Sequence, residues 1–135
     1  RLADGRLAMI FNASSAANAS ERRESLYDEL EDTGEGAQGA TVAAPAARKA
    51  FWGAPRAPMT LALSADDGLT WPWQRSLEVG DGWCMSNDSE QGRNREYSYP
   101  SLRQDADGTL HLAYTVFRQH IRHVRLQPDW ATQQP

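Results

Sequence analysis

The arginines and tyrosines of this chain are the side chains best suited to chemistry. A guanidinium meets a carboxylate with two parallel N–H donors, so Arg56, Arg95 and Arg118 are candidate ligands for an anion. A phenol becomes a nucleophile when a base takes its proton, and Tyr97 and Tyr99 stand in the stretch NREYSYPSLRQ. From the residues alone, a tyrosine at a strand start is more typical of packing, and Arg56 is more typical of a solvated loop.

Other reactive side chains point to no metal and no cofactor. Cys84 is the single cysteine, which excludes an internal disulfide and does not support a metal cluster. The histidines lack the spacing of a metal site; they are His111, His120 and His123. Arg95 is expected to form an ion pair with Glu96 at the rim of the loop, and Arg118 is expected on the surface or near a pocket mouth.

The stretch SADDGLTW, Ser64 to Trp71, is a turn in which each special residue has a structural task. Asp66 can accept hydrogen bonds from backbone N–H groups of the turn, and Gly68 can adopt a positive φ. Thr70 can bond back to the turn, and Trp71 can cover it with an apolar face. The turn is therefore interpreted as structural.

The elements that flank these residues read as strands. Apolar side chains alternate at Met59, Leu61 and Leu63, which is the period of a half-buried strand. Asp-Gly pairs punctuate the chain as hairpin or loop signals. The pattern predicts an all-β chain with six strands, at about Arg6–Asn12, Pro58–Ser64, Pro72–Val79, Tyr97–Gln104, Thr109–Phe117 and His120–Leu126.

A long segment, Ser14 to Ala54, separates the first two predicted strands. Its first half, SERRESLYDELED, predicts a helix with Ser20 at the N-cap. Its second half is rich in Gly, Ala and Pro and predicts a flexible loop. The segment is interpreted as a surface insertion, and a lid beside a substrate pocket is the alternative.

The turn motif Ser-Xaa-Asp-Xaa-Gly-Xaa-Thr-Trp resembles the Asp-box of sialidase-like β-propellers with BNR repeats. An internal echo, ADGRLAMIFN against ADGTLHLAYT, suits a repeated β-meander. The resemblance implies a partial six-bladed propeller of about one and a half blades, with residues 1–135 as its C-terminal part and residues 14–54 as an insertion. In that family the Asp-box lies away from the active site.

The resemblance also implies roles for particular residues. In sialidases a nucleophilic tyrosine at a strand start is followed by Ser and Leu and then by an Asp-Gly turn. Tyr99 fits this frame with Ser101, Leu102 and Asp107, whereas Tyr97 is two residues out of frame and Pro100 replaces the usual Ser. A neutral phenol suits an anomeric carbon that carries a carboxylate, because a carboxylate nucleophile would be repelled.

The sialidase resemblance assigns the arginines to the substrate carboxylate. Arg56 holds the position of the last of three sialidase arginines, before an apolar strand and an Asp-box. The acid/base Asp, the first Arg and the Glu that activates the Tyr come from earlier blades. The first hypothesis is thus the C-terminal portion of a retaining exo-sialidase. The alternatives are a non-catalytic propeller that binds glycans or proteins, and a related polysaccharide-cleaving enzyme.

The net charge and the unpaired strand edges indicate which binding partners to expect. The net charge of −4 and the pI near 5.3 argue against a nucleic-acid partner. No run of residues reads as a transmembrane helix, so no membrane partner is expected. The expected partner is a sialylated or other acidic glycan. One and a half blades leave open strand edges, which predicts self-association.

Overall fold

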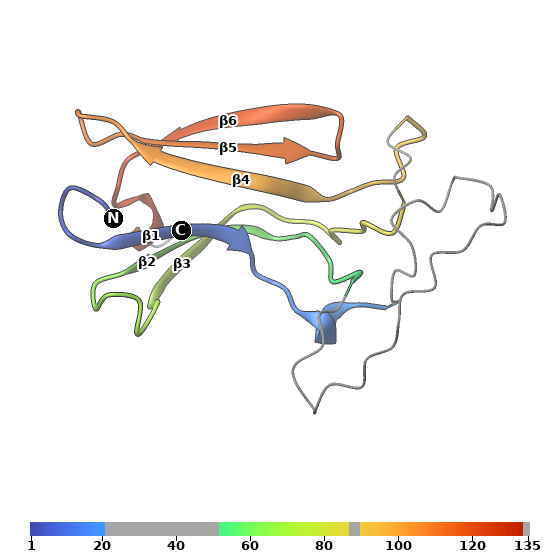
Figure 1. The fold of residues 1–135 in the computed structure, drawn as a ribbon, viewed down its shortest axis with the longest axis horizontal. Coiled ribbons are helices and arrows are strands. Elements are labelled where there is room, and N and C mark those ends of the chain that lie inside the picture. The colour runs from blue at the N-terminus through green and yellow to red at the C-terminus, as the bar shows by residue number, and fades with distance from the viewer. Residues whose placement is uncertain (21–51, 87–89, 134–135) are drawn as a thin grey trace, which may run out of the picture.

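The computed structural model describes residues 1–20, 52–86 and 90–133 and contains two three-stranded antiparallel sheets (Figure 1). One sheet has the order β1-β2-β3 and the other the order β4-β5-β6. The strands are β1 Leu7–Asn12, β2 Met59–Ser64, β3 Trp73–Glu78, β4 Tyr97–Gln104, β5 Leu110–Val116 and β6 His120–Leu126. Two single-turn 3₁₀ helices, η1 Ala16–Asn18 and η2 Trp130–Thr132, complete the elements of these residues.

The predicted strands are confirmed, and each observed bound lies within about one residue of the expected bound. The described residues are therefore all-β, with almost no helix. The helix expected after Ser20 falls outside the described residues. No helix in the described ranges has the length and apolar character needed to cross a bilayer.

The two sheets pack face to face through their central strands. Leu61 and Leu63 of β2 meet Leu110 and Leu112 of β5, and all four side chains are fully buried. Alternate residues of a strand share one face, so the alternation of apolar residues builds this layer directly. Burial of each leucine stabilises the fold by about 1.5–3 kcal/mol.

A second apolar cluster lies between the sheets, around Tyr97 and Tyr114. Their rings pack edge to face with centroids 6.3 Å apart. The Tyr114 hydroxyl donates a 2.7 Å hydrogen bond to Oε1 of Glu78, which belongs to the other sheet. Burial and then this hydrogen bond raise the pKa of Tyr114 well above its ordinary value. The bond therefore joins a neutral phenol to a carboxylate across the two sheets.

A bulge in β4 changes the direction of its side chains. Ser98 pairs with Thr115 of β5 but Ser101 pairs with Ala113, so Tyr99 and Pro100 together oppose a single β5 residue. Proline has no N–H for the ladder, which suits a bulged position. The backbone at Tyr99 has a φ of 52°, in the left-handed region. The bulge places the side chain of Tyr99 outside the core, with 72% of the residue exposed.

Candidate functional site

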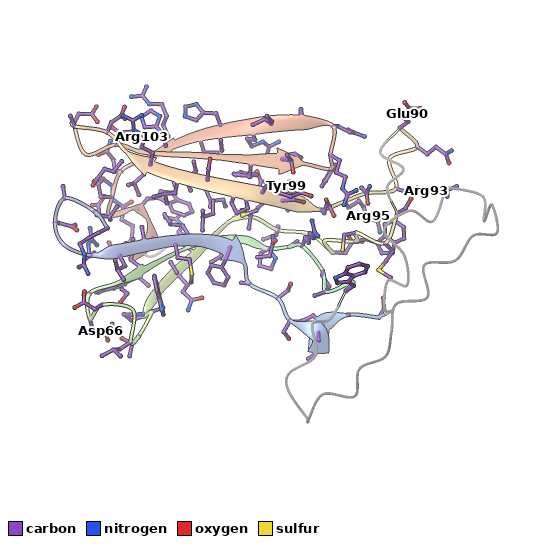
Figure 2. The ribbon with its side chains drawn as sticks, viewed as in Figure 1. Asp66, Glu90, Arg93, Arg95, Tyr99 and Arg103 are labelled. Carbon is purple, nitrogen blue, oxygen red and sulfur yellow. The ribbon has the colours of Figure 1, made fainter. Side chains whose placement is uncertain are left out.

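The two motifs singled out in the sequence lie at opposite ends of the sheets. Figure 2 shows Asp66 at the end where β2 turns into β3, and Tyr99 and Arg95 near the other end, where β4 begins. The resemblance to sialidases predicts this separation of the Asp-box from a site around Tyr99.

The Asp66 turn satisfies its own polar groups. Oδ1 of Asp66 accepts hydrogen bonds from the Ser64 hydroxyl at 2.7 Å and the Thr70 N–H at 2.9 Å, and Oδ2 accepts from the Thr70 hydroxyl at 2.6 Å. The Ser64 oxygen accepts from the Gly68 N–H, and the Trp71 indole donates to the Gly68 carbonyl. Hydrogen bonds from Thr70 and Ser64 lower the pKa of Asp66 to about 2.

At the other end, a buried carboxylate gathers side chains from separate segments. We call Arg56, Glu96, Ser98 and Arg118 the arginine cluster. Nε of Arg118 donates to Oε1 of Glu96 at 2.6 Å, and the Ser98 hydroxyl donates to the same oxygen at 2.7 Å. Nη1 of Arg56 lies 3.6 Å from that oxygen. Glu96 is fully buried, whereas the side chains of Arg56 and Arg118 are 39% and 21% exposed.

Backbone contacts hold Arg56 between two neighbouring segments. Its N–H donates to the Gly82 carbonyl at 2.8 Å, and its carbonyl accepts from the Tyr97 N–H at 2.9 Å. A Cβ at Gly82 would lie 2.6 Å from the Arg56 nitrogen and 2.5 Å from the Ala57 nitrogen. Only glycine therefore permits this approach, and Gly82 also has a φ of 63°.

Arg118 reaches the cluster from the turn between β5 and β6. The backbone is left-handed at Phe117 and Arg118, with φ values of 54° and 56°. The Phe117 N–H donates to the Glu96 carbonyl, which fixes the turn beside the carboxylate. Burial disfavours the charge of Arg118, but its hydrogen bond to Glu96 and the attraction of the Glu96 carboxylate raise its pKa above the ordinary value. Arg118 is therefore held as a cation beside Glu96.

The two tyrosines of the motif occupy different environments. Tyr97 is 6% exposed, and its hydroxyl donates to the Val79 carbonyl at 3.4 Å. Burial, followed by the nearby charge of Glu78, raises the pKa of Tyr97. Tyr99 is 72% exposed and directly follows Ser98 of the arginine cluster in the chain, so it is the tyrosine that a ligand at this end could reach.

The expected ion pair between Arg95 and Glu96 is wrong. Arg95 instead forks onto Asp81, with Nη2 to Oδ2 at 2.7 Å and Nε to Oδ1 at 3.0 Å, and lies over the Trp83 ring. Glu96 is fully buried, whereas the Arg95 side chain is 47% exposed, so the two adjacent residues lie in different environments. The charge of Arg95 is thereby balanced by Asp81 at the rim.

A small cavity with a volume of about 220 Å³ includes Pro55, the residue before Arg56, in its wall. Its walls combine apolar and polar side chains. The lining residues are Asn18, Ser20, Gly53, Pro55, Asp81, Trp83, Cys84 and Met85. The rim ion pair therefore borders this cavity through Asp81.

The described residues hold no group of three His, Cys, Asp or Glu side chains that could bind a metal ion. Two of the histidines nevertheless form a pair on the outer face of the second sheet. Nδ1 of His111 lies 3.0 Å from Nε2 of His123, the rings stack, and Nε2 of His111 lies 3.0 Å from Oδ2 of Asp105. This pair belongs to a different face from the arginine cluster.

The sequence patterns missed Glu96 and Ser98 as members of the site. Both are buried polar residues, with 0% and 2% exposure. Alternation places them on the side of the chain opposite Tyr97, which packs in the apolar core, so the sequence pattern alone does not predict their burial. Their arginine partners lie 22 and 42 positions away in the chain and carry no local signal.

Comparison with known proteins identifies the family. The BNR repeat-like domain matches residues 1–112, and the chain belongs to this family. BNR repeat domains are found in sialidases and other glycan-related proteins. No curated protein and no solved structure matches the chain.

Proposed function

We propose that this member of the BNR repeat-like domain family forms part of a β-propeller glycoside hydrolase that releases a terminal acidic sugar. The preferred substrate in this proposal is a sialoside. The observation that carries the proposal is the arginine cluster beside Tyr99. Arg56 and Arg118 lie at one buried carboxylate, and their side chains are 39% and 21% exposed, so an anion can approach both guanidinium groups. Guanidinium forks are well matched to a sugar carboxylate.

In the proposed reaction Tyr99 is the nucleophile. Its Oη forms a bond to the anomeric carbon as the glycosidic C–O bond breaks, and a water molecule then releases the sugar with retention. The phenol proton must pass to a base and the leaving oxygen must receive a proton from an acid. Arg56 and Arg118 orient the carboxylate, whereas Arg95 is committed to Asp81 and contributes to the rim.

A fluorogenic sialoside tests the proposal on the protein in its full encoded length. We expect Tyr99→Phe to lower kcat/KM by about 10³-fold or more, since it deletes the attacking oxygen. The matched control is Tyr97→Phe, which removes a hydroxyl that only contacts the Val79 carbonyl. Equal activity of wild type and Tyr99→Phe would overturn the role of Tyr99.

One observation favours a second function, a propeller that binds acidic glycans without cleaving them. No carboxylate among the described residues is hydrogen-bonded to the Tyr99 phenol, so no such group activates it there. In that case Tyr99 would pack against the sugar. The wild type would then bind a sialoside without cleaving it, and Arg56→Gln would weaken this binding. A substrate screen separates sialosides from other acidic polysaccharides.

Self-association is proposed for the chain on its own. Each sheet has only three strands, so β3 and β6 present outer edges that a further strand could pair with. We expect the mean mass measured by light scattering to rise with concentration. A constant monomer mass over the whole range would contradict this prediction.

A further inference from the structure

The carboxylate of Glu96 is placed to influence which anions the arginine cluster accepts. Its Oε1 accepts hydrogen bonds from Arg118 and Ser98 and lies 3.6 Å from Nη1 of Arg56. It is fully buried, so a ligand contacts the arginines and not Glu96 itself. Any effect of Glu96 on a ligand must therefore act through charge and through the placement of the guanidinium groups.

The negative charge of Glu96 changes the relative affinity of the arginine cluster for singly and doubly charged anions. Two guanidinium groups without a counter-charge attract a doubly charged phosphate more strongly than a singly charged carboxylate, because the Coulomb energy scales with the product of the charges. Each negative charge placed beside the arginines reduces the attraction for a dianion about twice as much as for a monoanion. This difference holds whatever else Arg118 contacts.

We propose that Glu96 is a specificity-determining residue that makes the arginine cluster select singly charged carboxylates over doubly charged phosphates. The inference rests on the proposed function, in which this cluster binds the carboxylate of a sugar. The geometry supports it because the negative charge is buried among the cations, where solvent screens it little. Asp81 holds Arg95 by the same kind of fork, but its side chain is 57% exposed and thus well screened.

The test measures the affinities of two probes, N-acetylneuraminic acid and glucose 6-phosphate, at pH 7.5 by NMR titration of the full encoded protein. At this pH the phosphate is largely doubly charged. In Glu96→Gln, which keeps the side-chain shape, we expect the affinity ratio to move about tenfold toward the phosphate. Glu96→Asp keeps the charge and should leave the ratio unchanged, and the control Asp81→Asn should change it by less than about twofold.

A second variant tests the same inference from the opposite direction. Arg56→Gln removes a positive charge from a side chain that is 39% exposed, so the fold should tolerate it. The affinity ratio of the two probes should then move toward the carboxylate. This measurement does not depend on whether Glu96→Gln folds. Unchanged ratios in the folded variants, with the sugar acid still bound by the wild type, would overturn the inference alone. A wild type that binds neither probe would overturn the proposed function and the inference with it.

Discussion

At one end of the sheets Asp66 shares its carboxylate among groups of its own turn, all within four positions of it. At the other end Glu96 holds Arg118 from the β5–β6 turn and lies beside Arg56, which precedes β2. The first network is local and partly open to water. The second joins both sheets, is buried at its centre and has exposed cations around it.

This difference separates a folding device from a candidate site. A carboxylate whose oxygens accept hydrogen bonds from the neighbouring backbone and hydroxyl groups fixes a turn and has little capacity left for a ligand. A carboxylate that lies beside two cations need not occupy all their N–H groups, as with Arg56, whose side chain is 39% exposed and whose contacts among the described residues use Nη1. Changes at the two ends should therefore affect stability and binding in different proportions.

The largest effect on stability is expected from Arg118→Met. The substitution leaves the fully buried Glu96 without its closest cation, and breaking a buried pair in this way costs about 3–5 kcal/mol. Urea unfolding followed by tryptophan fluorescence measures the change. The matched control is Arg95→Met, whose pair with Asp81 is about half exposed and should cost no more than about 1 kcal/mol. Equal losses in the two variants would remove the distinction between buried and rim pairs.

At the Asp66 end, Ser64→Ala should cost about 1–3 kcal/mol, since it removes the acceptor of the Gly68 N–H and one of the two donors to Oδ1 of Asp66, and the Ser64 side chain is fully buried. Sialoside affinity should stay within about twofold of wild type, because the turn is remote from the arginine cluster. Ser101→Ala, at an exposed position, serves as the control for loss of a hydroxyl. A fall in affinity with Ser64→Ala would show that the two ends are coupled.

The same contrast explains what the sequence could predict. The alternation of apolar residues located all six strands, and the spacing in SADDGLTW indicated the bonds of Asp66 with Thr70, because these contacts depend on local geometry. The pairing of Glu96 with Arg118 depends on the β4–β5 register and on a left-handed turn at Phe117 and Arg118. The approach of Arg56 depends on how the two sheets pack, and neither arrangement has a local sequence signal. Adjacency in the chain suggested Arg95 as the partner of Glu96, but Arg95 pairs with Asp81 at the rim while Glu96 is buried.

The pH response sharpens the contrast at the Asp66 end. The Thr70 hydrogen bonds lower the folded pKa of Asp66 to about 2, below the value of 3.8 that applies to an unfolded chain. The contribution of Asp66 to stability is therefore present above pH 3.8 and is lost as the pH falls through about 2. Carboxyl ¹³C shifts measured against pH should show this titration. Thr70→Val removes the strongest cause and should raise the pKa of Asp66 toward its ordinary value. A wild-type midpoint near the ordinary value would show that the turn does not favour the carboxylate.

The smallest change in stability is expected when the Tyr99 side chain is removed, although sialoside binding should be lost. Its φ of 52° costs a non-glycine residue about 1–2 kcal/mol, and the mostly exposed side chain contributes little packing. Tyr99→Gly relieves the backbone but gives the unfolded chain more freedom, so the net gain should stay within about 1 kcal/mol. Tyr99→Ala removes the same ring without relieving φ, and the difference between the two variants in urea unfolding isolates the backbone term. If the Tyr99→Gly variant proved less stable than Tyr99→Ala, the left-handed backbone at position 99 would not be strained. The conformation of the bulge would then need no compensating role in ligand binding.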